Sequence, residues 1–303
     1  MLRRNFVYFT LPIGGCQRPP RHVAGFVVMG RHIAAAGSPV DRPLFLAPDF
    51  TLPSTPNVRW LFTLSDDETL EWFWDEWGAP PLEELTPLRK PRSSENNRHI
   101  PVTAYSMTMG DHICLESGLE HDLLRRVDRD PEVRLIVAQP LRLSWPTNKA
   151  GSRSRRYHTP DLLTARGNGE VTVWDARSED RIDEDFRATV ELTRRACHDV
   201  GWRYELFTGL GNAERLNLIW LHGFRKRPPW ADQFEDQLRA ATTTAETTTA
   251  ETTLGGLFAL DDGTGRLIST VWHLIWRGVL AIDMAAPITK RTAVTVAKER
   301  ANV

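Results

Sequence analysis

From about residue 97 onward, apolar and polar residues alternate with periods that predict regular secondary structure. Residues 105–115 predict a hairpin that turns at Gly110-Asp111. Leu119, Leu123 and Val127 are spaced like one face of a helix, so a helix is expected over residues 117–127.

Strand-like alternation follows this helix. Residues 133–145 carry apolar side chains at every second position, which predicts one long strand or two consecutive strands. Residues 157–165 and 170–177 predict two further strands, joined by a Gly-Asn-Gly turn that is a strong hairpin signal. Apolar residues at intervals of four and three predict an amphipathic helix over 186–200, and a strand is expected over 202–207. A helix, several strands, a helix and a strand together predict a mixed α/β core over residues 97–241.

The beginning of the chain has a different pattern. More than half of its 20 prolines lie within the first 90 residues. Because proline interrupts both helices and strands, irregular structure is expected in an N-terminal extension, residues 1–96, of unknown role. The aromatic cluster Trp72–Trp77 within it is expected to dock on its own protein.

The end of the chain predicts a linker and a small module. A short helix is expected over 230–241. The repeat TTTAETTTAETT that follows has no apolar face, so residues 242–256 are interpreted as a linker. Residues 257–303 then combine a probable helix at 267–277 with an extended segment, which is the size and order of a winged-helix module. We expect this C-terminal unit to make few contacts with the core.

Charge is balanced over the whole chain but not locally. The net charge is −1 and 25% of the residues are charged, so any nucleic-acid surface must be local. Residues 141–160 contain no acidic residue and five basic ones, Arg142, Lys149, Arg153, Arg155 and Arg156. A basic run is often only a solvated loop. This run directly precedes Asp161, so an anionic backbone that it attracts would arrive beside a carboxylate.

Cysteine usage and hydropathy favour a cytoplasmic protein. Cys16, Cys114 and Cys197 are widely separated, which argues against a disulfide framework or a zinc ribbon. No apolar run is long enough to span a bilayer. Residues 1–16 faintly resemble a lipoprotein signal, but Pro12 interrupts their short apolar part.

Three carboxylates and one cation form the candidate active site. Glu120 falls within the apolar arc of the first expected helix, and Asp161 lies in the first strand of the expected hairpin, residues 157–165. Asp175 and Arg177 share one face of the second strand. Convergent carboxylates can hold Mg²⁺ or Mn²⁺ and leave room for water and phosphate. The pattern therefore predicts a metal-dependent nuclease.

Glu120 also has a local explanation. Ser117-x-x-Glu120 is a capping box, in which glutamate at the third helical position bonds back to the helix start. An unrelated α/β protein whose carboxylates belong only to turns and caps is a further alternative.

Several short motifs occur in order between residues 97 and 294. They are RHIP (98–101), LESGLE (115–120), DPEV (130–133), Gln139-Pro140, HTPD (158–161), WDAR (174–177), Gly201-Trp202 with Phe207, NLIWLHGF (217–224) and HLIWRGVLAID (273–283). In this order they resemble the TnsA-like endonuclease subunit of heteromeric transposases, especially its actinobacterial members. The resemblance implies a restriction-endonuclease-like fold of the PD-(D/E)xK class, with a mixed sheet flanked by helices and a small helical or winged-helix-like C-terminal domain.

The resemblance also implies a role. Such a subunit nicks DNA at transposon ends while a separate DDE transposase cuts and joins the other strand, and an AAA+ ATPase regulator is a further expected partner. The expected location is the nucleoid-associated cytoplasm, with no membrane attachment.

The motifs can be carried over residue by residue. Glu120 matches the helix glutamate, Asp161 the aspartate of the PD element, and Asp175 the second acidic position. Gln139 matches a structural or DNA-proximal amide. Arg177 stands where the class has lysine, and arginine stays charged, so it can stabilise anions but cannot deprotonate to orient water.

The loss of this lysine leaves a second hypothesis open. The protein could be a catalytically silent DNA-binding or assembly subunit that retains the nuclease fold. Against this, three clustered acidic side chains repel one another unless a cation binds them.

Overall fold

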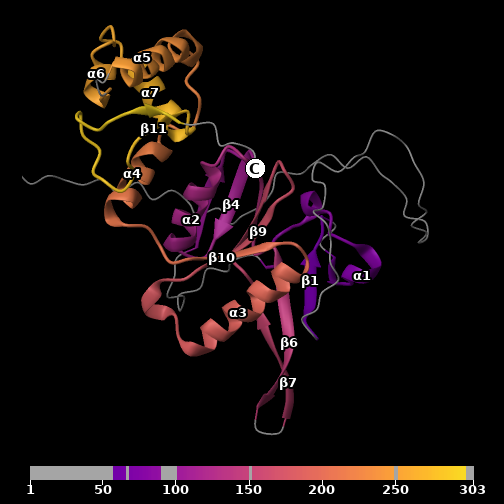
Figure 1. Cartoon of the computed structure of the whole chain (residues 1–303). Coiled ribbons are helices and arrows are strands. Elements are labelled where there is room, and N and C mark those ends of the chain that lie inside the picture. The colour runs from indigo at the N-terminus through magenta and orange to yellow at the C-terminus, as the bar shows by residue number, and fades with distance from the viewer. Residues whose placement is uncertain (1–56, 66–67, 90–100, 150–151, 249–251, 298–303) are drawn as a thin grey trace, which may run out of the picture. The chain divides into compact units, whose positions relative to one another are not determined.

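The computed structural model describes residues 57–65, 68–89, 101–149, 152–248 and 252–297, all within the compact unit Pro43–Val303. The described chain is a mixed α/β structure with antiparallel sheets and helices, as the periodicity predicts (Figure 1). The predictions for the remaining residues, including most of the N-terminal extension, lie outside the described residues.

One four-stranded sheet carries the candidate carboxylates. Its order is β10-β9-β8-β5, formed by Arg203–Phe207, Val171–Ala176, Leu162–Arg166 and Val133–Ala138. Neighbouring strands are antiparallel except β9 and β10, which are parallel. Parallel strands need a crossover connection, and α3 (Glu184–Asp199) supplies it. The expected hairpin is present between β8 and β9, where Gly169 takes a positive φ of 89°.

A second four-stranded sheet is antiparallel throughout. Its order is β2-β1-β6-β7, formed by Thr69–Trp72, Arg59–Thr63, Leu141–Lys149 and Ser152–His158. The chain passes from the first sheet to the second at Gln139-Pro140, where Gln139 adopts a φ of 46°. Non-glycine residues rarely occupy this left-handed region, so Gln139 marks a sharp turn. The strands expected over 133–145 are therefore two strands in different sheets.

The segment before residue 90 is more regular than its prolines predict. β1 pairs with both β2 and β6. The tryptophan cluster docks on its own protein, as expected: the Trp74 ring lies 5.2 Å from both Trp60 and Trp202, centroid to centroid. Trp74 begins the short helix α1 (Trp74–Trp77), and the 3₁₀ turn η1 (Leu82–Glu84) follows it. Large buried aromatic side chains thus stabilise a segment whose local sequence is unfavourable for regular structure.

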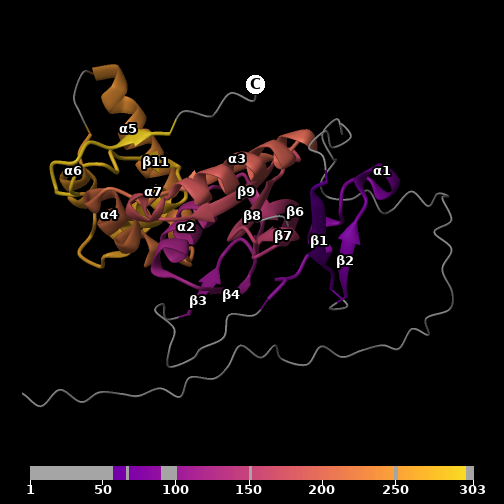
Figure 2. The same ribbon diagram turned by 90° about the horizontal axis from the view of Figure 1, so that it is seen from below.

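The first sheet is covered on both faces (Figure 2). One face packs on α2 (Gly118–Asp128) and on the hairpin of β3 (Val102–Ser106) and β4 (Asp111–Leu115), which confirms the helix and hairpin expected there. The other face packs on α3 and on the buried side of the second sheet.

Two of the three cysteines lie in the described residues. Cys197 on α3 is buried and free. Cys114 lies on β4, where its Sγ is 3.9 Å from the Thr103 hydroxyl.

The C-terminal elements share one apolar cluster of their own. They are α4 (Asn212–His222), the 3₁₀ turn η3 (Ala231–Gln233), α5 (Glu235–Thr248), α6 (Leu254–Phe258), α7 (Arg266–Trp276) and the paired strands β11 (Leu280–Ala281) and β12 (Thr295–Val296). In the part of the chain that the structure describes, no helix is long and apolar enough to cross a membrane.

Two expectations about this region are corrected. The segment expected as a linker is helical through Thr248, and Thr242 is buried with its hydroxyl donating to the Leu238 carbonyl. Leu218 and Leu221 of α4 belong to the same apolar cluster as residues 254–294. The expected lack of contact between residues 257–303 and the preceding chain is therefore wrong, because α4 needs an apolar partner and finds it there.

Candidate functional site

The turn between β7 and β8 places Asp161 beside β9 through backbone hydrogen bonds. Its N–H donates to the Trp174 carbonyl at 2.9 Å, and its carbonyl accepts from the Gln139 N–H at 2.8 Å. Its carboxylate Oδ2 accepts from the Ala176 N–H at 2.7 Å. These contacts hold Asp161 close to Asp175, its neighbour on β9.

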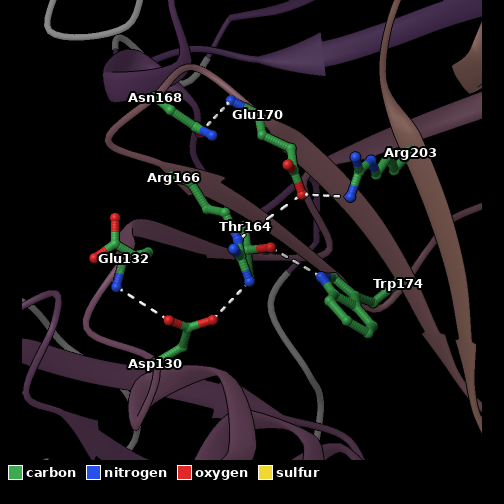
Figure 3. A network of polar contacts seen from close by, with 8 residues as sticks. All are labelled: Asp130, Glu132, Thr164, Arg166, Asn168, Glu170, Trp174 and Arg203. Carbon is green, nitrogen blue, oxygen red and sulfur yellow. Dashed lines mark hydrogen bonds and ion pairs between the residues drawn. The ribbon is translucent and has the colours of Figure 1, made fainter. Parts of the chain in front are cut away.

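A polar network at the far end of the β8–β9 hairpin fixes the same strands (Figure 3). Arg166 Nη2 donates to Asp130 Oδ2 at 2.7 Å, and Arg203 Nη1 donates to Glu170 Oε1 at 2.9 Å. Arg166 belongs to β8 and Arg203 to β10. The network thus joins the β8–β9 hairpin to β10 and to the segment around Asp130. It also holds the strand register that positions Asp161 and Asp175.

Asp175 is buried, with 3% of its surface exposed. Its Oδ2 accepts two hydrogen bonds, from His158 Nε2 at 2.8 Å and from the Tyr204 hydroxyl at 2.6 Å. The negative charge of Asp175 also acts on two neighbouring groups. Burial first, and the charge of Asp175 second, raise the pKa of both the Tyr204 phenol and the Cys197 thiol.

Asp175 and Glu120 both lie within electrostatic reach of Asp161. The pKa of Asp161 is raised well above its usual range, first by burial and then by the charges of Asp175 and Glu120. Each of these neighbours makes ionisation of Asp161 less favourable. Asp161 is thus near each of the other two acidic residues that the sequence selects.

Glu120 also forms the capping box. Its Oε1 accepts from the Ser117 hydroxyl at 2.8 Å, and its Oε2 accepts from the Glu116 N–H at 2.8 Å. In return, Ser117 Oγ accepts from the Glu120 N–H at 3.2 Å. Burial raises the pKa of Glu120, while these two hydrogen bonds to its carboxylate oppose the rise. The cap and the acidic cluster thus use the same side chain.

Because Glu120 is hydrogen-bonded at its own helix start, fewer carboxylates are available to bind a metal ion. Within the described residues, no group of three or more histidine, cysteine, aspartate or glutamate side chains is arranged to hold a metal ion. Asp161 and Asp175 remain as a close pair, and the side-chain hydrogen bonds that each accepts fall on its own Oδ2. Mg²⁺ is commonly held by one or two carboxylates together with waters and substrate oxygens, so the chemistry of this pair fits Mg²⁺.

The Arg177 side chain contacts the 3₁₀ turn η2 (Glu179–Arg181) and the start of α3. Its Nε donates to the Arg181 carbonyl at 2.7 Å, and its guanidinium carbon lies 4.2 Å from the centre of the Phe186 ring. Arg181 belongs to η2, and Phe186 to the first turn of α3. The cation expected to face phosphate is therefore held by a carbonyl and an aromatic face.

The basic run forms the β6–β7 hairpin instead of a solvated loop. Arg155 donates from Nη2 to the Ser144 carbonyl at 2.7 Å, and Arg156 pairs with Asp185 of α3 at 3.5 Å. Lys149 and Arg153 lie in the paired strands, and their side chains are outside the description.

Gln139 is more deeply buried than a DNA-contacting amide. It is 1% exposed, and its Oε1 accepts from Arg89 Nε at 3.1 Å. Arg89 Nη2 also pairs with Glu116 at 2.8 Å. The Nε2 atom of Gln139 has no hydrogen-bond partner in the described part of the chain. The amide oxygen of Gln139 faces Arg89 because arginine only donates hydrogen bonds.

Sequence reasoning missed three residues of this region: Arg89, His158 and Tyr204. Arg89 precedes the motif-bearing part of the chain and carries no signal. His158 is the first residue of the HTPD motif. Tyr204 lies two residues after Trp202 on a predicted strand, so the two side chains are expected on the same, inward face. Only His158 and Tyr204 had a pattern from which a role near Asp175 could be suspected.

No protein-family model matches the chain, and no characterised protein matches its sequence.

Proposed function

We propose that this protein is a Mg²⁺-dependent DNA endonuclease subunit of a transposase complex, similar to TnsA. The observation that carries the proposal is the close pair of half-buried Asp161 and buried Asp175, with Glu120 within electrostatic reach of Asp161. Burying like charges together is unfavourable, and a fold keeps such an arrangement where a cation or a reaction uses it.

Asp161 and Asp175 would hold the cation, and Glu120 would join them through a water ligand or by releasing its cap hydrogen bonds. When bound, Mg²⁺ polarises a phosphodiester and lowers the pKa of a bound water. Mn²⁺ is expected to substitute for it. The chain's own contribution is to hold Asp161 and Asp175 in register and to shield them partly from water, so that their charge acts at short range.

The order α2, β5, β8, β9, α3 and β10 supports a restriction-endonuclease-like core, with β9 and β10 parallel across α3. The C-terminal helices followed by the β11–β12 pair support a winged-helix-like module. With the motif order, these features favour DNA, a DDE transposase and an AAA+ ATPase as partners in the nucleoid-associated cytoplasm.

A second candidate function is favoured by a separate observation. Glu120 bonds its own helix start, and Arg177 bonds the Arg181 carbonyl and stacks on Phe186. Both residues would have to leave these partners to act on phosphate. A catalytically silent DNA-binding or assembly subunit needs no such movement.

Nicking of a supercoiled plasmid that carries a transposon end separates the two functions. Wild-type protein with its partners is expected to nick only when Mg²⁺ or Mn²⁺ is present, and Asp161→Asn is expected to abolish nicking while it leaves DNA binding intact. A wild-type complex that binds the end but never nicks would establish the silent subunit. Activity that survives Asp161→Asn would reject the assigned site.

A further inference from the structure

Two donors meet on a single oxygen of Asp175. His158 Nε2 lies 2.8 Å from Oδ2, and the Tyr204 hydroxyl lies 2.6 Å from the same atom. The three residues come from β7, β9 and β10, so both four-stranded sheets contribute to this contact.

Hydrogen-bond chemistry fixes the direction of both contacts. An ionised carboxylate only accepts, so the Tyr204 hydroxyl donates and His158 must carry a proton on Nε2. Together they occupy both lone-pair directions of Oδ2. Oδ1 is then the oxygen of Asp175 that is left for a ligand.

The two donors are themselves held in place. Tyr204 is 6% exposed, and the guanidinium of Arg194 lies over its ring at 5.5 Å. The His158 ring meets the Phe186 ring edge-on, 6.4 Å between centroids. Side chains packed in this way lose little further freedom when they hold a carboxylate, which favours a pre-organised site.

We infer that Tyr204 and His158 are positioning residues that orient Asp175 and present its Oδ1 to the divalent cation. This inference rests on the proposed nuclease function and adds residues to its site. Partners that hydrogen-bond a metal-ligating carboxylate orient it, and their loss commonly weakens metal affinity or activity by about 10–100-fold.

The test uses Tyr204→Phe in the full-length chain, because it removes one hydroxyl and keeps the buried ring. Mn²⁺ affinity is measured by electron paramagnetic resonance without DNA, and the kcat and KM of nicking are measured with the partner proteins. We expect Mn²⁺ affinity to fall by roughly 10-fold or more and kcat to fall with it, while KM for DNA stays unchanged. Tyr105→Phe, on the exposed side of β3, is the matched control and is expected to resemble wild type.

Replacement of His158 provides a conservative rescue. His158→Gln keeps an N–H donor at a similar reach and is expected to retain more Mn²⁺ affinity than His158→Leu, which keeps bulk but cannot donate. All assays are run well below the melting temperature of each variant. If the role of His158 were only structural, the two variants would therefore have equal Mn²⁺ affinity.

The results distinguish the positioning role of Tyr204 and His158 from the proposed nuclease function. If wild type binds Mn²⁺ and nicks, but Tyr204→Phe and His158→Leu both match it, the positioning role is wrong and the nuclease stands. If wild type neither binds Mn²⁺ nor nicks with its partners, the nuclease function itself fails, and the positioning role fails with it.

Discussion

Arg129, which follows α2, donates from Nε to the backbone carbonyl of Trp276 at the end of α7, 3.0 Å away. Its Nη2 donates to the preceding carbonyl, that of Ile275, at 2.8 Å. The last carbonyls of a helix have no partner within it, so this arginine caps α7 from outside. The helix that carries Glu120 is thereby joined to the C-terminal apolar cluster.

Replacement of this capping arginine is expected to be destabilising. Arg129→Ala would leave two buried carbonyls without their donors, and an unsatisfied buried group costs about 1–3 kcal/mol. Urea denaturation is expected to show a loss in that range. Arg134→Ala, at an exposed position of β5, is the control and is expected to change stability by less than about 0.5 kcal/mol. An equal effect of both variants would show that the contact contributes nothing specific.

Asp161→Asn is expected to stabilise the metal-free protein near neutral pH. Because burial and the charges of Asp175 and Glu120 raise the pKa of Asp161, the folded state binds this proton more tightly than the unfolded state does. Ionised Asp161 therefore destabilises the folded state. This destabilisation is absent below the pKa of Asp161 in the unfolded state, about 4. It grows as the pH rises from there to the folded-state pKa, and it is complete above the folded-state pKa.

Melting temperatures in EDTA test this expectation. The variant should melt higher than wild type at pH 8 and the difference should shrink toward pH 4, at roughly 2–4 °C for each kcal/mol of charge repulsion removed. Added Mg²⁺ should raise the wild-type value more than the variant's. A variant less stable than wild type at pH 8 would contradict the repulsion described here.

Acidification should loosen the contact between α2 and α4. The rings of His121 and His222 meet edge-on with centroids 6.2 Å apart. Burial first, and then the positive charges of Arg125 near His121 and of Arg225 and Arg125 near His222, lower the pKa of each histidine to about 4. The folded state therefore binds fewer protons than the unfolded state, so their stabilising contribution is complete above about pH 6.5 and is lost as pH falls toward 4.

The double variant His121→Gln with His222→Gln should lose less stability over that interval than wild type. We expect the difference to be on the order of 1–2 kcal/mol, because both rings are partly exposed and solvent screens them. Urea denaturation at pH 7.5, 5.5 and 4.5 measures it. Parallel pH profiles for the two proteins would assign the acid sensitivity to other groups.

Arg177 tests the departure from lysine. If its charge stabilises the reacting phosphate, Arg177→Ala should reduce nicking by the assembled complex by about two to three orders of magnitude, with DNA binding mostly intact. Arg177→Lys should keep partial activity, since the charge remains and the planar fork is lost. Phe186→Leu removes the stacking face but leaves the arginine, so it should be far milder. Nicking rates that are unchanged in Arg177→Ala would show that this cation serves only the start of α3.

The local elements and the kinds of residue at the site could be predicted from the amino-acid sequence. α2, α3 and the β8–β9 hairpin follow from periodicity and turn residues that lie within one short stretch of chain, so no distant contact was needed to predict them. The acidic residues Glu120, Asp161 and Asp175 were selectable for the same reason, since each stands at the end of such an element. The capping box at Ser117 was also local, and it is present.

Which distant segments meet depends on tertiary packing. Trp60 of β1 lies opposite Leu143 of β6, and its ring lies 5.8 Å from that of Trp202, but no local pattern in the sequence records either contact. His158 and Tyr204 reach Asp175 from 17 and 29 residues away, and Arg89 reaches Gln139 from 50. The helical course of residues 242–248 likewise depends on cover for Leu238 and Thr242. Periodicity reports the face that a residue occupies on its own element, whereas its partner is set by how the elements pack.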